Sequence, residues 1–358
     1  MMQRHISFIV NSFIKSFIFV VMILTCLIFI LNLVSELDFF RKIEVEGYFI
    51  IYLALINSPS FLFEILPFIF LISTQVFFIE LFKNNEMNIF KYSGLRNSKV
   101  ITIISITTVI ISLFSLIIFY SFSSNLKNMY INLKKDFTND GKYLAVITKN
   151  GLWIKDVFDN KNYIINAERI ELNYLKKTYI SEFDKEYNII RNIKSPKIDI
   201  KNSNWIVHKP EVFINNNTSN YKQLEIKTNF DYEIIQNLYS NLSTLSILEL
   251  FELRSNYKKL NYSLIEVNLE ILKLFSYPLY FLLMILFSSI IMLNTRKFKS
   301  SILKISIGLI SAVVIFYLNN IFYVLGKTEK INLIISVFAP LLILGIINIF
   351  LMNKINAK

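Results

Sequence analysis

The sequence predicts a membrane protein of six spanning helices, with an all-β domain of jelly-roll type inserted between the third and fourth helix. Of the 358 residues, 54% are hydrophobic, and the mean hydropathy of +0.49 is well above that of an ordinary soluble domain. Six apolar runs reach the roughly 20 residues that cross a bilayer as a helix. Between the third and fourth run, residues 125–262 are polar and show repeated period-two alternation, which is typical of strands.

These runs divide the chain into three predicted parts: residues 1–124, the β domain at 125–262, and residues 263–358. The second run contains Pro59 and Pro67, so we expect a kink or a re-entrant start there. The first run is too long for a cleaved signal peptide. It also holds the one cysteine, Cys26, which excludes an intrachain disulfide. The runs lie at Ser12–Val34, Phe49–Ile79, Val100–Phe122, Leu269–Leu293, Ile302–Phe322 and Ile331–Met352.

The basic residues that flank the runs predict the orientation, because cytoplasmic loops carry an excess of lysine and arginine. The short loops on the opposite side carry acids that offset their basic residues. We therefore expect both termini in the cytoplasm and the β domain on the other side. The net charge of +12 reflects this bias and gives no indication of nucleic-acid binding. The basic set is Arg4, Lys15, Lys83, Lys91, Arg96, Lys99, Arg296, Lys297, Lys299, Lys304, Lys354 and Lys358.

A short polar segment, residues 84–94, separates the second and third runs and predicts a small cytoplasmic helix. Asn84 or Asn85 can cap its first turn, and Glu86 lies where the helix dipole favours an acid. Lys91 falls in the last turn, and Gly94 follows where a left-handed residue ends a helix. Its apolar side is formed by Met87, Ile89 and Phe90. We interpret this helix as the place where the chain receives force from the cytoplasm.

Charged residues near the spans give further candidates. Arg41 and Lys42 lie just past the end of the first span, where they either anchor the chain at the interface or contact an anionic lipid head group. Glu64 lies three residues before Pro67, near the middle of the second span. An acid there usually faces protein or water, so we expect it to pair with a basic group or with freed backbone rather than to transfer protons.

The fourth span begins with a charged stripe of Glu266, Glu270 and Lys273, whose spacing places them on one helix face. This stripe is either a polar helix start near the head groups or one wall of an internal cavity. Before it, Ser246 and Glu249 form a capping-box pattern that opens a helix reaching about Lys259.

The β domain is expected to contain many short strands separated by Asn- and Asp-rich turns. The expected strands centre on Tyr143–Ile147, Leu152–Ile154, Tyr163–Ile165, Ile170–Tyr174, Tyr179–Ile180, Tyr187–Ile190, Ile198–Ile200, Trp205–Val207, Val212–Ile214 and Leu224–Ile226.

The sequence holds no recognisable catalytic, cofactor or metal motif. Gly326-Lys327-Thr328 resembles the end of a phosphate loop, but Ile321 stands where the first glycine belongs and a membrane span precedes it. The two histidines, His5 and His208, are expected on opposite sides of the membrane, which argues against a shared metal. We therefore expect no enzyme and no cofactor, and any ATP must be hydrolysed by another subunit.

Taken together, the chain resembles the LptF/LptG family of lipopolysaccharide-export permeases over almost its full length. The most specific match is Asn85–Gly94, which keeps the family's spacing from Glu86 to Gly94. Asn85 stands where the family often has serine, and Lys91 stands where it usually has arginine and so lacks the guanidinium fork. Supporting matches are Pro59, Glu64–Pro67 and Leu245–Leu250. The segments Gly151–Asp156, Phe316–Asn320 and Ala339–Pro340 are more similar to LptG than to LptF.

The resemblance implies a subunit of an exporter in the bacterial inner membrane, with a periplasmic β domain. Its partners would be a paralogous LptF-type permease, an LptB ATPase dimer, LptC and the periplasmic bridge protein LptA, and its cargo would be lipopolysaccharide. Glu86 would pair with a basic residue of the ATPase, and Lys91 and Gly94 would complete the docking helix.

In that reading, Met87, Ile89 and Phe90 would fill the groove of the ATPase, while Arg41, Lys42 and Lys127 are candidate contacts for lipid phosphates. Two alternatives remain open at this point. One is a mechanotransmitting subunit that carries no lipid, which typically has four spans. The other is a membrane-bound enzyme or scaffold.

Overall fold

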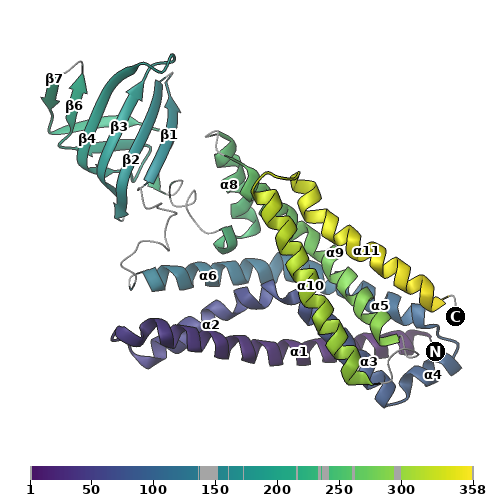
Figure 1. Cartoon of the computed structure of the whole chain (residues 1–358). Coiled ribbons are helices and arrows are strands. Elements are labelled where there is room, and N and C mark those ends of the chain that lie inside the picture. Colours follow the sequence, from purple (N-terminus) through teal and green to yellow (C-terminus); the bar gives the residue numbers. More distant parts are fainter. Residues whose placement is uncertain are drawn as a thin grey trace. The chain divides into compact units, whose positions relative to one another are not determined.

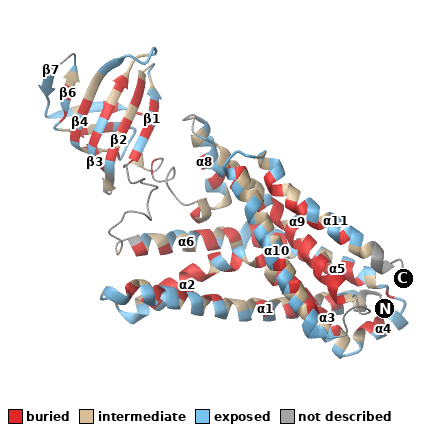
Figure 2. Ribbon diagram, in the orientation of Figure 1, coloured by how far each residue is buried: buried red, intermediate tan, exposed pale blue. Residues whose placement is uncertain are grey.

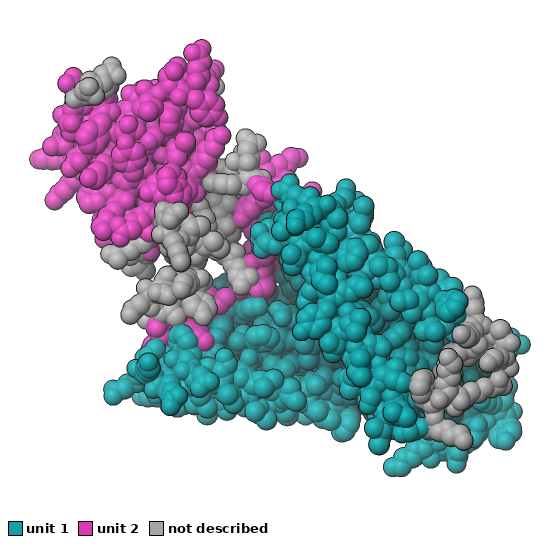
Figure 3. All heavy atoms as spheres, viewed as in Figure 1, with its two compact units in different colours: residues 1–130, 265–358 teal, residues 131–264 magenta. Residues whose placement is uncertain are grey.

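The computed structural model describes residues 2–135, 137, 152–159, 161–171, 173–214, 217–232, 235, 242–259, 263–293 and 300–356 (Figure 1). The chain forms two compact units, a helical one made of Met1–Tyr130 and Ile265–Lys358, and a second one of Ile131–Leu264 (Figure 3). The strand expected at Tyr143–Ile147 and the basic turn at 294–299 lie outside the described residues.

The helical unit begins with α1 (Met2–Phe39), the 3₁₀ turn η1 (Phe40–Lys42), α2 (Gly47–Glu64), α3 (Leu66–Lys83) and the short α4 (Glu86–Tyr92). One long helix follows, composed of α5 (Asn97–Phe114), the π-helical turn η2 (Ser115–Phe119) and α6 (Tyr120–Lys135). The unit ends with α9 (Ile265–Leu293), α10 (Ser301–Lys327) and α11 (Leu333–Asn356). Among the described residues, 7 helices are long and apolar enough to cross a membrane.

Seven helices stand where the sequence predicts six spans because the second run folds as α2 and α3 in series. The chain leaves the helix at Ile65 (φ −93°, ψ 4°), and Pro67 lies in the first turn of α3, where its missing N–H costs no hydrogen bond. The predicted interruption is therefore found at Pro67, whereas Pro59 is accommodated inside α2.

Helix α9 is the centre of the helical unit and packs against α3, α5, α10 and α11. Figure 2 shows its buried face, whereas in α1 and α10 about half of the residues are exposed and few are buried. Hydrogen bonds from small polar side chains tie the helices together, as is usual where lipid offers no hydrophobic driving force. Ser288 Oγ donates to the Leu71 carbonyl at 2.9 Å, and Asn348 Nδ2 donates to the Leu283 carbonyl at 2.9 Å.

Helices α10 and α11 approach each other at Gly326. A Cβ atom at this position would lie 2.4 Å from Ser336 Oγ, so only glycine fits there without displacing α11. The close approach brings the end of α10 against the start of α11.

The second unit contains an antiparallel sheet, which confirms the predicted all-β domain. Its strands are β1 (Leu152–Phe158), β2 (Lys161–Glu171), β3 (Tyr174–Phe183), β4 (Ile189–Asp199), β5 (Asn204–His208), β6 (Glu211–Ile214), β7 (Asn217–Asn220) and β8 (Gln223–Lys227). The order is β1-β2-β3-β4-β5-β8. β6 pairs with another stretch of the same edge of β4 and also with β7. Ser195 lies where that edge divides, and its hydroxyl donates to the His208 carbonyl at 2.7 Å.

Three strands are longer than the sequence pattern indicates. β2, β3 and β4 have 11, 10 and 11 residues, and they merge segments that the sequence analysis separates. Lys177 on β3 and Lys194 on β4 lie on exposed positions of the alternation, whereas Thr178, Glu182 and Ser195 are buried, so polar residues along the sequence do not end these strands. β7 begins at Asn217, the last residue of an Asn-rich stretch of the kind from which the sequence predicts turns.

The core of the sheet is aliphatic around one tryptophan. Trp205 is fully buried and its Nε1 donates to the Phe230 carbonyl at 2.8 Å. Ile165, Ile180 and Ile193, from three neighbouring strands, are also fully buried. After the sheet, η3 (Leu242–Thr244) leads into α8 (Ile247–Lys259). The predicted capping box is present, because the Ser246 N–H donates to Glu249 Oε2 at 2.7 Å and the Glu249 N–H donates to Ser246 Oγ at 3.4 Å.

One buried acid connects three strands of this sheet. Glu182 on β3 is 1% exposed at its side chain; Oε1 lies 2.8 Å from Lys161 Nζ on β2, and Oε2 pairs with Arg191 on β4. Burial alone would raise the pKa of Glu182, but the hydrogen bonds from Lys161 and Arg191 outweigh it and the pKa is lowered. A lowered folded-state pKa contributes stability above the unfolded pKa of about 4.3, and this is lost as the pH falls through the folded value.

We therefore expect Glu182→Gln to destabilise the sheet by about 2 kcal/mol at neutral pH, because it removes the buried carboxylate charge from two ion pairs whose cations, with side chains 44% and 27% exposed, are partly solvated. Both tryptophans of the chain, Trp153 and Trp205, lie in this unit, so their fluorescence follows its unfolding in urea. In the unsubstituted chain, the free energy of unfolding of this unit should decrease as the pH falls below about 4. In Glu182→Gln, the contribution of this carboxylate to the pH dependence should be absent.

The matched control is Glu168→Gln. This acid pairs with Lys177 at 2.8 Å, but both side chains are more than half exposed, so its loss should cost less than about 1 kcal/mol. Equal destabilisation by the two substitutions would contradict the role assigned to Glu182.

Candidate functional site

Helix α4 lies where the sequence predicts a small helix, but it starts differently. Asn85 occupies the N-cap position in a left-handed conformation, with φ 57°, and its side chain forms no cap. Asn84 Nδ2 donates instead to Glu86 Oε1 at 3.4 Å. The expected capping by Asn84 or Asn85 is therefore wrong, and backbone N–H groups of Asn88 and Ile89 bonding to the Asn85 carbonyl form the first turn.

The end of α4 agrees with the sequence. Gly94 has φ 80°, its N–H donates to the Lys91 carbonyl at 3.0 Å, and the Leu95 N–H donates to the Phe90 carbonyl at 2.9 Å. This pair of bonds is the Schellman ending that a left-handed glycine permits. Leu95 and Phe90 are both buried, so the chain leaves α4 in a fixed direction.

The apolar residues of α4 point in two directions. Met87 and Phe90 are buried inside the chain, and the Phe90 ring lies 6.0 Å from the rings of His5 and Phe8 on α1. Ile89 is 58% exposed and Tyr92 is 91% exposed. Met87 and Phe90 thus attach α4 to its own chain, which does not fit the expected role of filling a partner's groove. The surface left for a partner, here called the outer face of α4, consists of Glu86, Ile89, Lys91 and Tyr92.

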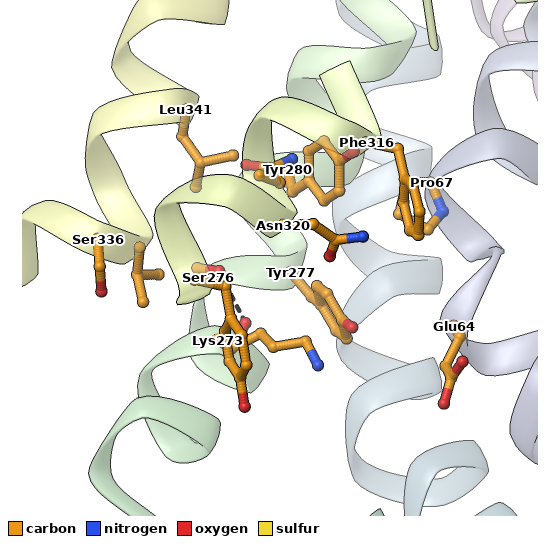
Figure 4. A pocket seen from close by; sticks show the side chains of 13 residues that line it. Glu64, Pro67, Lys273, Ser276, Tyr277, Tyr280, Phe316, Asn320, Ser336 and Leu341 are labelled. Carbon is orange, nitrogen blue, oxygen red and sulfur yellow. Dashed lines mark hydrogen bonds between the residues drawn. The ribbon is translucent and has the colours of Figure 1, made fainter. Parts of the chain in front are cut away.

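A cavity of about 180 Å³ lies inside the helical unit (Figure 4). Four parts of the chain surround it: the junction of α2 and α3, the first half of α9, the last half of α10 and the start of α11. Its lining is both aromatic and polar, consisting of Glu64, Pro67, Lys273, Ser276, Tyr277, Tyr280, Phe316, Asn319, Asn320, Tyr323, Ser336, Val337 and Leu341.

The charged stripe of α9 contributes only Lys273 to this cavity. Glu270 lies behind it, where Oε1 is 3.2 Å from Lys273 Nζ and Oε2 accepts a hydrogen bond from the Tyr323 hydroxyl at 3.0 Å. Glu266 pairs with Lys327 at 3.2 Å, and both side chains are about half exposed. Of the two readings of this stripe, the cavity wall therefore applies to Lys273, while Glu266 forms a surface pair.

At the edge of the cavity, Glu64 contacts Lys127, a residue that the sequence analysis assigns to a separate role. Lys127 Nζ lies 3.7 Å from Glu64 Oε1 and 6.0 Å from the centre of the Phe61 ring. Glu64 thus has the basic partner that its position inside an apolar run demands. Arg41 and Lys42, the remaining basic candidates, are exposed on η1 directly after α1.

Several lining residues were missed by sequence reasoning, notably Tyr280, Tyr323 and Ser336. A signal existed, because tyrosine and asparagine recur at three- to four-residue spacing near the ends of apolar runs. That spacing shows a shared helix face but cannot show that two such faces meet. Within the described residues, no group of three or more His, Cys, Asp or Glu side chains could hold a metal ion.

Comparison with known proteins gives one informative result. No curated protein matches the chain. A family model described as lipopolysaccharide export system permease LptF/LptG matches residues 7–354, which is nearly the whole chain and includes α4, the cavity and the sheet; it does not separate LptF from LptG. The chain therefore belongs to the LptF/LptG family of lipopolysaccharide export permeases and is a non-catalytic transporter subunit.

Proposed function

We propose that this chain is the permease subunit through which an ATPase-driven exporter extracts lipopolysaccharide from the bacterial inner membrane and passes it to a periplasmic bridge. The observation that carries the proposal is the outer face of α4. A half-buried acid lies beside two exposed apolar side chains and an exposed lysine on a short helix that directly joins two membrane-length helices. A partner bound there could move α3 and α5 directly.

The proposed assembly follows from the family and from the absence of a phosphate loop in the sequence. It contains a paralogous permease, an LptB ATPase dimer on the outer face of α4, LptC, and LptA as the bridge; this chain takes the LptG place. The basic flanks of the spans support cytoplasmic termini and a periplasmic domain over residues 125–262. The family match and the seven membrane-length helices favour this function over a four-span mechanotransmitting subunit.

Lipid phosphates would be held by Arg41 and Lys42, which are exposed at the end of α1. Lys127 needs a separate assignment because Glu64 already pairs with it. A phosphate reaching Lys127 has to compete with that carboxylate, so Lys127 would release Glu64 toward the cavity when lipid binds.

Glu86→Arg should abolish ATPase co-purification and coupled transport, because it places a cation against the basic residue expected on the ATPase. Membrane insertion should be unchanged, since Glu86 is not part of the buried core. Pull-down from membranes and a reconstituted transport assay check both points. The same charge reversal at exposed Glu252 on α8 serves as control, and unimpaired transport by Glu86→Arg would sink the docking assignment.

Ile89→Ala and Tyr92→Ala should each weaken ATPase binding about tenfold, as exposed apolar anchors of an interface do. They should leave the thermal stability of the isolated chain unchanged. Phe90→Ala should instead lower the melting temperature of the isolated chain, because the Phe90 ring packs inside the chain and not on the surface offered to the ATPase. The docking surface is misassigned if Ile89→Ala and Tyr92→Ala bind the ATPase normally.

A photocrosslinking residue at position 41 or 42 should capture lipopolysaccharide in membranes, and Arg41→Ala or Lys42→Ala alone should reduce transport only partly because several cations share the phosphates. The same crosslinker at exposed Ile310 on α10 controls for chance contact with lipid. Equal capture at positions 41, 42 and 310 would argue against a dedicated phosphate contact.

A further inference from the structure

Besides Pro59 inside α2 and Pro340 inside α11, the described helices of the helical unit carry three interruptions, each of a different kind. The first interruption is Ile65, where α2 ends and α3 begins. The second is the π-helical turn η2, which widens the long helix between α5 and α6. The third is Pro278 inside α9, which removes one backbone hydrogen bond. Proline kinks and π-turns are the usual causes of bends in helices.

All three interruptions meet at one aromatic side chain. Phe63, in the last turn of α2, lies 6.3 Å from the ring of Phe119, 5.0 Å from that of Tyr120 and 5.3 Å from that of Tyr277. Phe119 ends η2, Tyr120 begins α6, and Tyr277 directly precedes Pro278. Phe63, Tyr120 and Tyr277 are each at most 7% exposed, so the three weak points share one buried cluster.

The two helices that flank α4 are interrupted after the same length. α3 runs for 18 residues from its start to α4, and α5 runs for 18 residues from α4 to η2, which corresponds to about 27 Å each. Both arms pack against α9. α3, α4 and α5, here called the α4 lever, therefore form a frame with two equal arms whose ends lie at the Phe63 cluster.

Beyond the Phe63 cluster, the contacts between α2 and α6 are polar instead of aromatic. α2 and α6 are linked by the Glu64–Lys127 ion pair at 3.7 Å and by a weak contact of the Tyr52 hydroxyl with Met129 Sδ at 3.8 Å. The cavity of about 180 Å³ lies directly beside the junction, with Glu64, Pro67 and Tyr277 in its wall (Figure 4). Protein interiors are otherwise close-packed, so this space gives the junction room to move.

We propose that the Phe63 cluster is a hinge inside the membrane unit, across which the α4 lever swings against α2 and α6. Phe63 is its pivot, because it lies two residues before Ile65 and its ring packs against Phe119 at the end of η2 and against Tyr277, which precedes Pro278. That an ATPase drives the lever rests on the proposed function, whereas the hinge itself does not.

The hinge can be tested by distance measurements on the full chain in lipid nanodiscs, without ATPase or lipopolysaccharide. In a Cys26→Ser background, nitroxide labels at Ile106→Cys and Met129→Cys lie on either side of η2, at positions that are exposed in the structure. Labels at Ile302→Cys and Val324→Cys are a similar number of residues apart on α10, which has no interruption among its described residues. Electron–electron double resonance should give a distance distribution for the first pair roughly twice as wide as for the second.

Two variants distinguish bending at the Phe63 cluster from flexibility along the whole helix. Deleting Ile117 removes the extra residue of the π-turn and should narrow the first distribution to the width of the α10 pair. Phe63→Ala changes no helix length. It should widen the distance distribution between positions 106 and 129 and leave that of the α10 pair unchanged. Equal widths in the original chain, or a Phe63→Ala distribution that does not change, would overturn the hinge. Because no partner is present, these results stand apart from any failure of the docking experiments.

Discussion

The helical unit depends on one constraint: in hydrocarbon, every backbone N–H and C=O must find its partner within the protein. Straight helices meet this demand by themselves, so any interruption has to be enclosed by side chains. In this chain, aromatic rings pack against one side of the interruptions. Phe17 on α1 lies 4.9 Å from Phe70 on α3, Phe70 lies 4.9 Å from Phe281 on α9, and Tyr277 continues the series toward Phe63. The rings thus cover one side of these interruptions, whereas Ile117 and Ile118 of η2 are exposed on the other.

The same constraint explains how polar side chains are used. Near the C-terminal end of α1, Asn32 Nδ2 donates to Ser58 Oγ at 3.1 Å, and the Tyr130 hydroxyl donates to the nearly fully buried Glu36 at 2.7 Å. Inside the unit, Glu270 groups with Lys273 and Tyr323, and the buried Lys304 Nζ donates to the Met292 carbonyl at 3.0 Å. Both charged residues that line the cavity, Glu64 and Lys273, have a partner of opposite charge. Two residues of its polar lining also hold helices together, since Glu64 pairs with Lys127 on α6 and the Tyr323 hydroxyl donates to Glu270 on α9.

Local chemistry made part of this architecture predictable from the sequence. Gly94 ends α4 because only a left-handed residue allows that ending, and Ser246 with Glu249 opens α8 by a bond between neighbours in sequence. Apolar length and period-two alternation were enough for the helices and most strands. What could not be predicted depends on contacts between distant segments. The spacing of Met87 and Phe90 places them on one face of α4, but it does not show that this face is buried in the chain itself while Ile89 is exposed. Lys127 and Glu64 meet only because α2 and α6 lie together, and η2 leaves no residue pattern of its own.

The equal arms of the α4 lever relate this chain to the thickness of its membrane. Each arm is about 27 Å long, close to the roughly 30 Å of a typical hydrocarbon core, whereas the 38 residues of α1 extend to about 57 Å. A thicker or thinner bilayer creates hydrophobic mismatch along the arms, which a tilt relieves at a small cost per ångström. Since the arms end at the Phe63 cluster, such a tilt bends the chain at that level. Lipid composition thereby becomes a mechanical load on this permease, in addition to being the environment of its cargo.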